Sequence, residues 1–172
     1  EMPCVYILSS GGPNVDGDRY VQNFTVHKNA FAHISTGAAT KLAEMRRNYS
    51  GMTQKIVLEE GAYLEYLPEP VIPCRHTRFI CDTEITAHPT ASLVYSEVYM
   101  GGRKYYNGGE LFEFDILSVT TRGQRPDGRQ LFREKFIRPA ARRPASYRRD
   151  GQLRCICQCG GGDAAGIGRY NI

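Results

Sequence analysis

The 172-residue sequence lacks any run of about 18 apolar residues, so it contains no candidate for a membrane-spanning helix. It also starts without the basic and apolar segments of a secretory signal peptide. We therefore expect a cytoplasmic protein without a membrane partner, whose six cysteines are reduced thiols. A chain of this length is expected to form one domain, with or without a tail.

Signatures of common enzyme classes are missing as well. The sequence has no G-x-x-x-x-G-K-[ST] phosphate-binding loop and no G-x-S-x-G nucleophile elbow. Carboxylates are numerous, and a pair of them could carry acid–base chemistry, but the sequence does not indicate which two would meet. These absences favour a protein that is not an enzyme.

Basic residues are scarce outside the C-terminal third of the chain. Residues 122–172 hold 12 Lys or Arg and 4 Asp or Glu, whereas residues 1–121 hold 10 and 14. A basic tail can contact nucleic acid or an acidic protein surface. Because aromatic residues are not interleaved with the basic ones as in a nucleic-acid reader, we expect a solvated tail and no nucleic-acid partner.

The chain is rich in short segments in which apolar and polar residues alternate, the pattern of strands with one buried face. These segments are residues 19–27, 52–60, 79–85, 111–119 and 131–137. In residues 93–100 both faces are apolar or aromatic apart from Ser96 and Glu97, which predicts a buried sheet strand. Turn-forming residues separate them, as in Asn107-Gly108-Gly109 and Pro126-Asp127-Gly128. The pattern predicts a mainly all-β domain, built as a sandwich, a barrel or stacked sheets.

One segment has two almost equally good interpretations. Residues 38–47 place Leu42 and Met45 at helical spacing, and Thr36 is a suitable cap, so a short helix is predicted there. The alternative is a strand through residues 30–42.

From Pro139 onward the sequence shows no strand or helix period, so we expect irregular structure. The motif Cys155-x-Cys157-x-Cys159 lies in this region, but structural zinc sites need four ligands and usually spacers of two to four residues. We interpret it as a coincidence of low complexity rather than as a metal site. The predicted organisation is a β-rich domain over residues 1–138 and a basic, Gly- and Cys-rich tail over residues 139–172.

Four segments with unusual motifs follow one another along the chain. They are residues 10–42, with Ser35-Thr36-Gly37-Ala38-Ala39-Thr40-Lys41; residues 57–79, with LEYLPEPVIP; residues 96–115, with SEVYMGGR; and residues 131–136, LFREKF. This series resembles the UreD family of urease accessory proteins, called UreH in some bacteria, over roughly residues 2–138. The matching motif positions are Thr36, Ala39, Thr40, Lys41, Glu65, Pro68, Pro70, Glu97, Gly102 and Arg103.

Members of that family continue with further strands, whereas the Arg-, Gly- and Cys-rich tail does not align with them. A truncated or frame-shifted C-terminal region is therefore one interpretation of the tail.

The resemblance implies a fold of stacked, β-helix-like sheets with one or two short helices, and a nonenzymatic role as a metallochaperone scaffold. UreD proteins bind apo-urease and recruit UreF, which binds the GTPase UreG, and nickel reaches urease through this assembly. The resemblance implies the same partners here, with no tightly bound cofactor and with Ni²⁺ only in transit. The alternative is a β-rich structural or interaction subunit that handles no metal.

An ion in transit needs weak, exchangeable oxygen or imidazole ligands, because a closed tetradentate site would trap nickel. Side chains beside the family-like segments that offer such ligands are His33, Glu60, Glu65 and Asp82. We expect these four to be candidates for a nickel path. For each one singly, the alternative is an ordinary surface carboxylate or a packed histidine.

Overall fold

Strands make up all the regular structure in the described part of the chain. The computed structural model describes the backbone of residues 1–139, 152–159 and 165–171, and the side chains of residues 1–137. The strands are β1 (Cys4–Ile7), β2 (Arg19–Val26), β3 (Phe31–Thr36), β4 (Thr40–Leu42), β5 (Ser50–Leu58), β6 (Tyr63–Tyr66), β7 (Val71–Pro73), β8 (Arg78–Ala87), β9 (Ser92–Met100), β10 (Ile116–Gln124), β11 (Gln130–Pro139), β12 (Gln152–Cys159) and β13 (Ala165–Asn171). None of these residues belongs to a helix that could cross a membrane.

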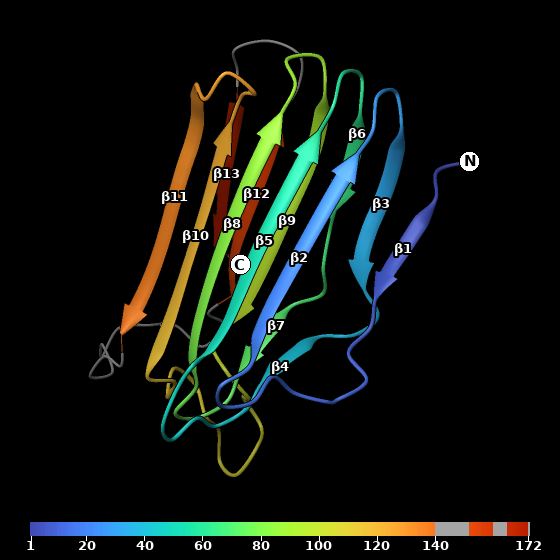
Figure 1. Ribbon diagram of the computed structural model, residues 1–172. Helices are drawn as coiled ribbons and strands as arrows, with labels where there is room; N and C mark the ends of the chain where they lie inside the picture. The colour runs from blue at the N-terminus through green and yellow to red at the C-terminus, as the bar shows by residue number, and fades with distance from the viewer. Residues whose placement is uncertain (140–151, 160–164, 172) are drawn as a thin grey trace.

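The strands form two sheets that face each other (Figure 1). The five-stranded sheet has the order β11-β10-β8-β5-β2, and the eight-stranded sheet has the order β1-β3-β6-β9-β12-β13, with β7 pairing β9 and β4 pairing β7. The chain alternates between the sheets, and strands of successive turns pair in parallel, β2 with β5, β5 with β8 and β8 with β10. This is the stacked-coil arrangement of a β-helix, which confirms the fold that the family resemblance implies.

Side chains that point between the sheets line up in rows because the coils are in register. The polar row consists of Gln22, Gln54, Thr83, Thr121 and Glu134, each the register partner of the next. Two hydrophobic clusters flank this row in the described residues. One contains Ile56 and Ile85, and the other contains Cys81 and Val119. The polar row therefore crosses the molecule between two separate apolar cores.

One glycine is required by the packing of the first cluster. Gly123 lies in register between Ile85 and Phe132, where a side chain would complete an apolar row. A Cβ atom at Gly123 would lie 2.2 Å from the ring of Phe132. The Phe132 ring therefore fills the space that a side chain at this position would need.

The predicted helix at residues 38–47 is wrong, and the alternative strand is the better description. Residues 40–42 form β4, which pairs in parallel with β7, and the Thr40 N–H donates to the Pro70 carbonyl. Leu42 and Met45 are both buried, but they belong to a strand and a loop. Pairing with the neighbouring coil outweighs the local helical spacing.

The predicted strand at residues 111–119 begins too early. Residues 101–115 form a loop, in which Phe112 has a positive φ of 60°, and β10 starts only at Ile116. Phe114 is buried against the second cluster although it precedes the strand, so its apolar character misled the prediction.

Irregular structure in the tail is contradicted for two segments. β12 pairs antiparallel with β9, and β13 pairs with β12. The free edge of β9 supplies hydrogen-bond partners that the local sequence pattern does not reveal. The remainder of the tail and the side chains of Cys155, Cys157 and Cys159 lie outside the described residues.

Candidate functional site

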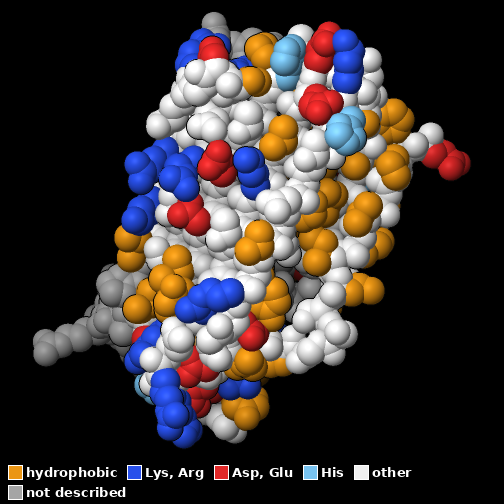
Figure 2. Space-filling view, in the orientation of Figure 1, with side chains coloured by type: hydrophobic (Ala, Val, Ile, Leu, Met, Phe, Trp, Pro, Cys, Tyr) orange, Lys and Arg blue, Asp and Glu red, His pale blue; other side chains and the backbone are white. Residues whose placement is uncertain are grey.

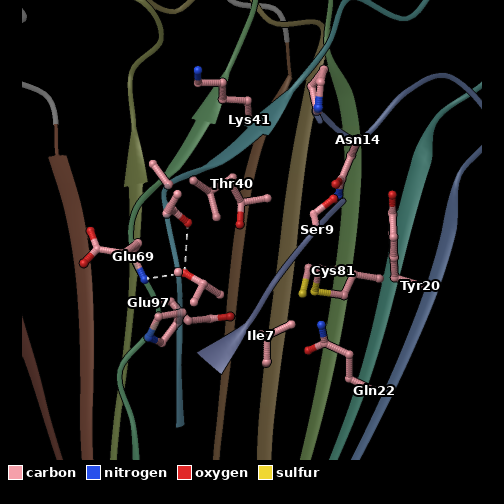
Figure 3. Close-up of a pocket in the computed structure, with 18 of the residues that line it drawn as sticks. Ile7, Ser9, Asn14, Tyr20, Gln22, Thr40, Lys41, Glu69, Cys81 and Glu97 are labelled. Carbon is pink, nitrogen blue, oxygen red and sulfur yellow. Dashed lines mark hydrogen bonds between the residues drawn. The ribbon is translucent and has the colours of Figure 1, made fainter. Parts of the chain in front are cut away.

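A cavity of about 470 Å³ lies between the two sheets (Figure 3). Its walls come from β2, β5 and β8 on one side and from β1, β6, β9 and residues 36–41 on the other. In Figure 3, Asn14, Thr40 and Lys41 lie at one end, and Gln22 and Glu97 lie toward the other. The cavity thus joins the loop segments at one end of the coils to the polar row.

Six of the ten family-motif positions line this cavity. They are Thr36, Ala39, Thr40, Lys41, Pro68 and Glu97. The motif segments hold one another in place, because the Thr36 hydroxyl accepts a hydrogen bond from the Glu69 N–H at 3.0 Å and donates to the Ala38 carbonyl at 3.1 Å. A hydrogen bond therefore joins the motif of residues 36–41 to the proline-rich segment of the next coil.

Two polar side chains lie at the end of the cavity formed by residues 14 and 41. Asn14 is buried there, and its Nδ2 has no hydrogen-bond partner among the described residues. Lys41 is exposed at the same end. These groups make this end of the cavity more polar than the two hydrophobic clusters on either side of the polar row.

Glu97 is the one carboxylate that reaches the interior from β9, and it is only 6% exposed. Its oxygens accept hydrogen bonds from the Tyr99 hydroxyl at 3.2 Å and from the Thr121 hydroxyl at 3.4 Å. Burial raises the pKa of Glu97, and the charge of Glu134 acts in the same direction, while those hydrogen bonds offset only part of the rise. Glu97 is thus a buried carboxyl group whose hydrogen bonds offset only part of the cost of its burial. It lies where the cavity meets the polar row.

Hydrogen bonds connect most of the polar row into one network. The Gln54 amide donates to the Gln22 side chain at 2.8 Å and to the Tyr66 hydroxyl at 2.5 Å, and it accepts from the Thr83 hydroxyl at 2.9 Å. Buried polar groups need such partners because an unmet one is costly. The row therefore presents amide and hydroxyl oxygens along the axis of the coils.

Two of the four remaining motif residues, Gly102 and Arg103, brace the loop of residues 101–115. Arg103 forms a two-pronged ion pair with the buried Glu110, with Nε to Oε2 at 2.7 Å and Nη2 to Oε1 at 2.8 Å. The guanidinium lowers the pKa of Glu110. Gly102 has a φ of 130°, and a Cβ there would lie 2.2 Å from the Glu110 carbonyl oxygen. These positions shape a loop and do not line the cavity.

None of the four nickel-path candidates lines the cavity. His33 and Glu65 do come together, with His33 Nδ1 2.9 Å from Glu65 Oε2, but on the outer face of the eight-stranded sheet. Glu60 pairs with Lys28 at 2.6 Å in an exposed turn, and Asp82 pairs with Arg122 at 2.8 Å on the outside of the five-stranded sheet. Their part in a nickel path stays a prediction.

Sequence reasoning missed the polar row although a signal existed. Gln22 falls between Tyr20 and Phe24 on the inward face of its strand, and Gln54 falls between Met52 and Ile56 in the same way. A polar residue at an apolar-face position in strands 32 residues apart points to a buried row once parallel coils are assumed.

Most of this chain is similar in sequence to known proteins. The family model described as UreD urease accessory protein matches residues 1–156. The urease accessory protein UreD 2 of Brucella ovis is 48% identical over 141 residues, which are 82% of this chain and 47% of the relative. The urease accessory protein UreD of Yersinia pestis bv. Antiqua is 45% identical over 137 residues, 80% of this chain and 50% of the relative. The chain spans about half the length of these curated relatives.

Proposed function

This chain belongs to the UreD family of urease accessory proteins, and we propose that it acts as a nonenzymatic scaffold in urease maturation. In this proposal it binds apo-urease in the cytoplasm and, together with UreF and with UreG through UreF, enables insertion of nickel into the urease active site. Ni²⁺ is the cargo of this process and passes without becoming a resident cofactor.

The polar interior is the observation that supports handling of a metal ion. Glu97 offers a carboxylate that contacts the polar row through Thr121, and Gln54 and Thr83 of the same row offer amide and hydroxyl oxygens. Within residues 1–137 no three or more His, Cys, Asp or Glu side chains are grouped to hold a metal. Sparse oxygen ligands suit transit, because they bind first-row divalent ions less tightly than a complete set of nitrogen and sulfur ligands.

The test is urease activation in cells that express the urease subunits, UreF, UreG and either the natural chain or Glu97→Gln. This substitution keeps the size of the side chain and removes the carboxylate. We expect Glu97→Gln to retain apo-urease in a pull-down and to lower both urease activity and the nickel content of purified urease. Glu84→Gln, on the outer face of the five-stranded sheet, is the matched control and should behave like the natural chain.

Two other results would count against the proposal. Failure of the natural chain to retain apo-urease or UreF would remove the scaffold function. Retention of apo-urease with full nickel loading by Glu97→Gln would remove the metal path through the interior and leave an interaction subunit that handles no metal.

A further inference from the structure

The eight-stranded sheet ends at β1, and no strand in the described part of the chain pairs with the outer edge of β1 (Figure 1). The five-stranded sheet ends at β2 on the same side of the molecule. The His33 N–H donates to the Pro3 carbonyl at 2.9 Å, so the odd-numbered residues of this segment direct their backbone groups toward β3. The N–H and C=O groups of Cys4 and Tyr6 therefore point to the free edge.

The edge of β1 lacks the charges that usually prevent strands of different molecules from pairing. Residues 4–7 contain no charged side chain. By contrast, β11 at the far end of the five-stranded sheet carries the exposed residues Arg133 and Lys135. The two ends of the stack thus differ, and only the end at β1 is open to a further strand.

Apolar side chains on and beside β1 are exposed (Figure 2). Val5 points between the sheets like its buried register partner Ile34, but Val5 is 48% exposed because no coil covers it. Tyr6 and Leu8 are 60% and 76% exposed. The other exposed apolar side chains of these strands and the segment before them are Met2, Val21 and Phe31. Their combined exposed area, on the order of several hundred Å², approaches the about 800 Å² per partner of a standard interface.

We propose that β1 pairs antiparallel with β1 of a second copy of this chain, so that the eight-stranded sheets of two molecules join across a two-fold axis. The joined sheet keeps one face toward the interior of both molecules, so an inward residue must meet another inward residue. Val5 opposite Val5 of the second copy meets this condition and pairs Cys4 with Tyr6. Because Cys4 and Tyr6 hold the free backbone groups, each such pair can exchange both of its hydrogen bonds.

A second copy suits this edge because the edge is complementary to itself. Residues 2–8 contain no charged side chain, so the pairing brings no like charges together. The half-exposed Val5 side chains cover each other at the axis. Since β1 and β2 end their sheets on the same side, the same axis also brings the β2 edges of the two copies toward each other. This association goes beyond the proposed role in urease maturation and does not depend on it.

A disulfide across the axis tests the pairing and its register. In chains that also carry Cys4→Ser, Val5→Cys places two thiols at a non-hydrogen-bonded position, where Cα atoms about 4.5 Å apart can be bridged. Tyr6→Cys is the matched control, because it lies on the same edge but its two copies would be about 8 Å apart. After oxidation and digestion with trypsin, mass spectrometry measures peptide 1–19 linked to its own copy. We expect at least about tenfold more linked peptide from Val5→Cys.

Tyr6→Pro tests whether the natural chain associates through this edge. Proline removes the N–H that points to the second copy and none of the hydrogen bonds to β3. Tyr6→Ser is the control, because it removes the ring and keeps the N–H. In sedimentation velocity over a range of concentrations, we expect the natural chain to form dimers. The dissociation constant should rise at least about tenfold more in Tyr6→Pro than in Tyr6→Ser.

A natural chain that sediments as a monomer at every concentration would overturn the proposal. Equal yields of linked peptide from Val5→Cys and Tyr6→Cys would overturn the pairing of β1 with itself, and so would equal dissociation constants for Tyr6→Pro and Tyr6→Ser. If Tyr6→Pro does not fold, the comparison of the two cysteine variants decides, because both keep every backbone hydrogen bond of β1.

Discussion

Glu97 and Glu65 experience opposite electrostatic environments in one fold. Glu97 is buried between the sheets, where desolvation raises its pKa. Glu65 lies on an outer face, where hydrogen bonds from His33 and Tyr63 lower its pKa. The two residues therefore affect folding in opposite directions as the pH changes.

For Glu97→Gln, the stability relative to the natural chain should increase with pH. The folded state binds the Glu97 proton more tightly than the unfolded state, so ionisation costs stability from the usual pKa near 4.5 up to the raised folded value. Each unit of that rise is worth about 1.4 kcal/mol at high pH. Urea unfolding at several pH values between about 4 and 8 measures this difference. A difference that does not vary with pH would contradict the environment assigned to Glu97.

For Glu65→Gln, the opposite pH dependence is expected. The lowered pKa means that ionised Glu65 stabilises the fold above its usual pKa of 4.5 and that this contribution disappears as the pH falls through the folded value. By urea unfolding, the variant should lose about 1 kcal/mol at pH 7, and this loss should shrink as the pH falls below 4.5. Glu60→Gln is the control, since its exposed pair with Lys28 should have no measurable effect.

Sequence alone could identify some of these residues but not their surroundings. Glu97 stands out as a motif position in SEVYMGGR, but its burial and its contacts with the facing Thr121 and Glu134, 24 and 37 residues away, follow only from the fold. The sequence offers His33 and Glu65 as two of four candidate ligands, but their contact follows only from the parallel register between β3 and β6. Contacts between coils depend on register, which alternation within one strand does not encode.

At the scale of strands and loops, the polar row couples the coils of the five-stranded sheet. Gln54 is its central member, because it bonds to Gln22 on one neighbouring strand, to Thr83 on the other and to Tyr66 across the interior. Loss of Gln54 leaves several buried groups without a partner at once.

Gln54→Leu should lower the free energy of unfolding by about 2–3 kcal/mol, because the freed Tyr66 and Thr83 hydroxyls stay buried. Tyr66→Phe alone should lower the free energy of unfolding by less than Gln54→Leu does. In the Gln54→Leu background, Tyr66→Phe should lower it by still less, because it removes a hydroxyl that has already lost its partner. Urea unfolding of the two single variants and the double variant gives the coupling. Simple additivity would show that the bond between Gln54 and Tyr66 contributes nothing.

Gly102→Ala should destabilise the loop of residues 101–115 by more than about 2 kcal/mol, because it combines a backbone at φ 130° with a clash against Glu110. Gly128→Ala is the matched control. It also has a positive φ, of 85°, but nothing lies within 4 Å of its Cβ, so about 1 kcal/mol is expected. Equal costs in thermal unfolding would mean that the Glu110 carbonyl moves aside.

Most strands of the main body were predictable, and their partners were not. β2, β5, β8, β9 and β11 overlap predicted segments, since each alternates between a buried and an exposed face. β10 was displaced because Phe112 and Phe114 belong to a loop that nevertheless packs on the core. β12 depends on the edge of β9, which lies far away in the sequence.

At the scale of the whole molecule, the end of the coils at β1 and β2 is apolar and exposed. Figure 2 shows hydrophobic side chains gathered on the side of the molecule where β1, β2 and β3 lie. Leu8 is 76% exposed and Val21 is 71% exposed. Apolar patches beside an edge strand such as β1 favour association between molecules.

The double variant Leu8→Lys, Val21→Lys should reduce self-association of the chain. Charges at an apolar edge oppose the contact between molecules without removing any core side chain. Sedimentation velocity over a range of concentrations measures the effect. Ile80→Lys, on the outer face of β8, is the control and should leave association unchanged. Identical sedimentation of the double variant and the natural chain would show that this end does not drive association.

The spacing of the coils has a practical consequence. Register partners advance by 32 residues from β2 to β5 and by 29 from β5 to β8, but by 38 from β8 to β10. The longer step contains the loop of residues 101–115, whose tip carries the 88% exposed Tyr105. The stack already tolerates extra length at this corner without losing register, so an epitope tag or a fluorophore-bearing peptide inserted beside Tyr105 would report on the protein without disturbing its coils.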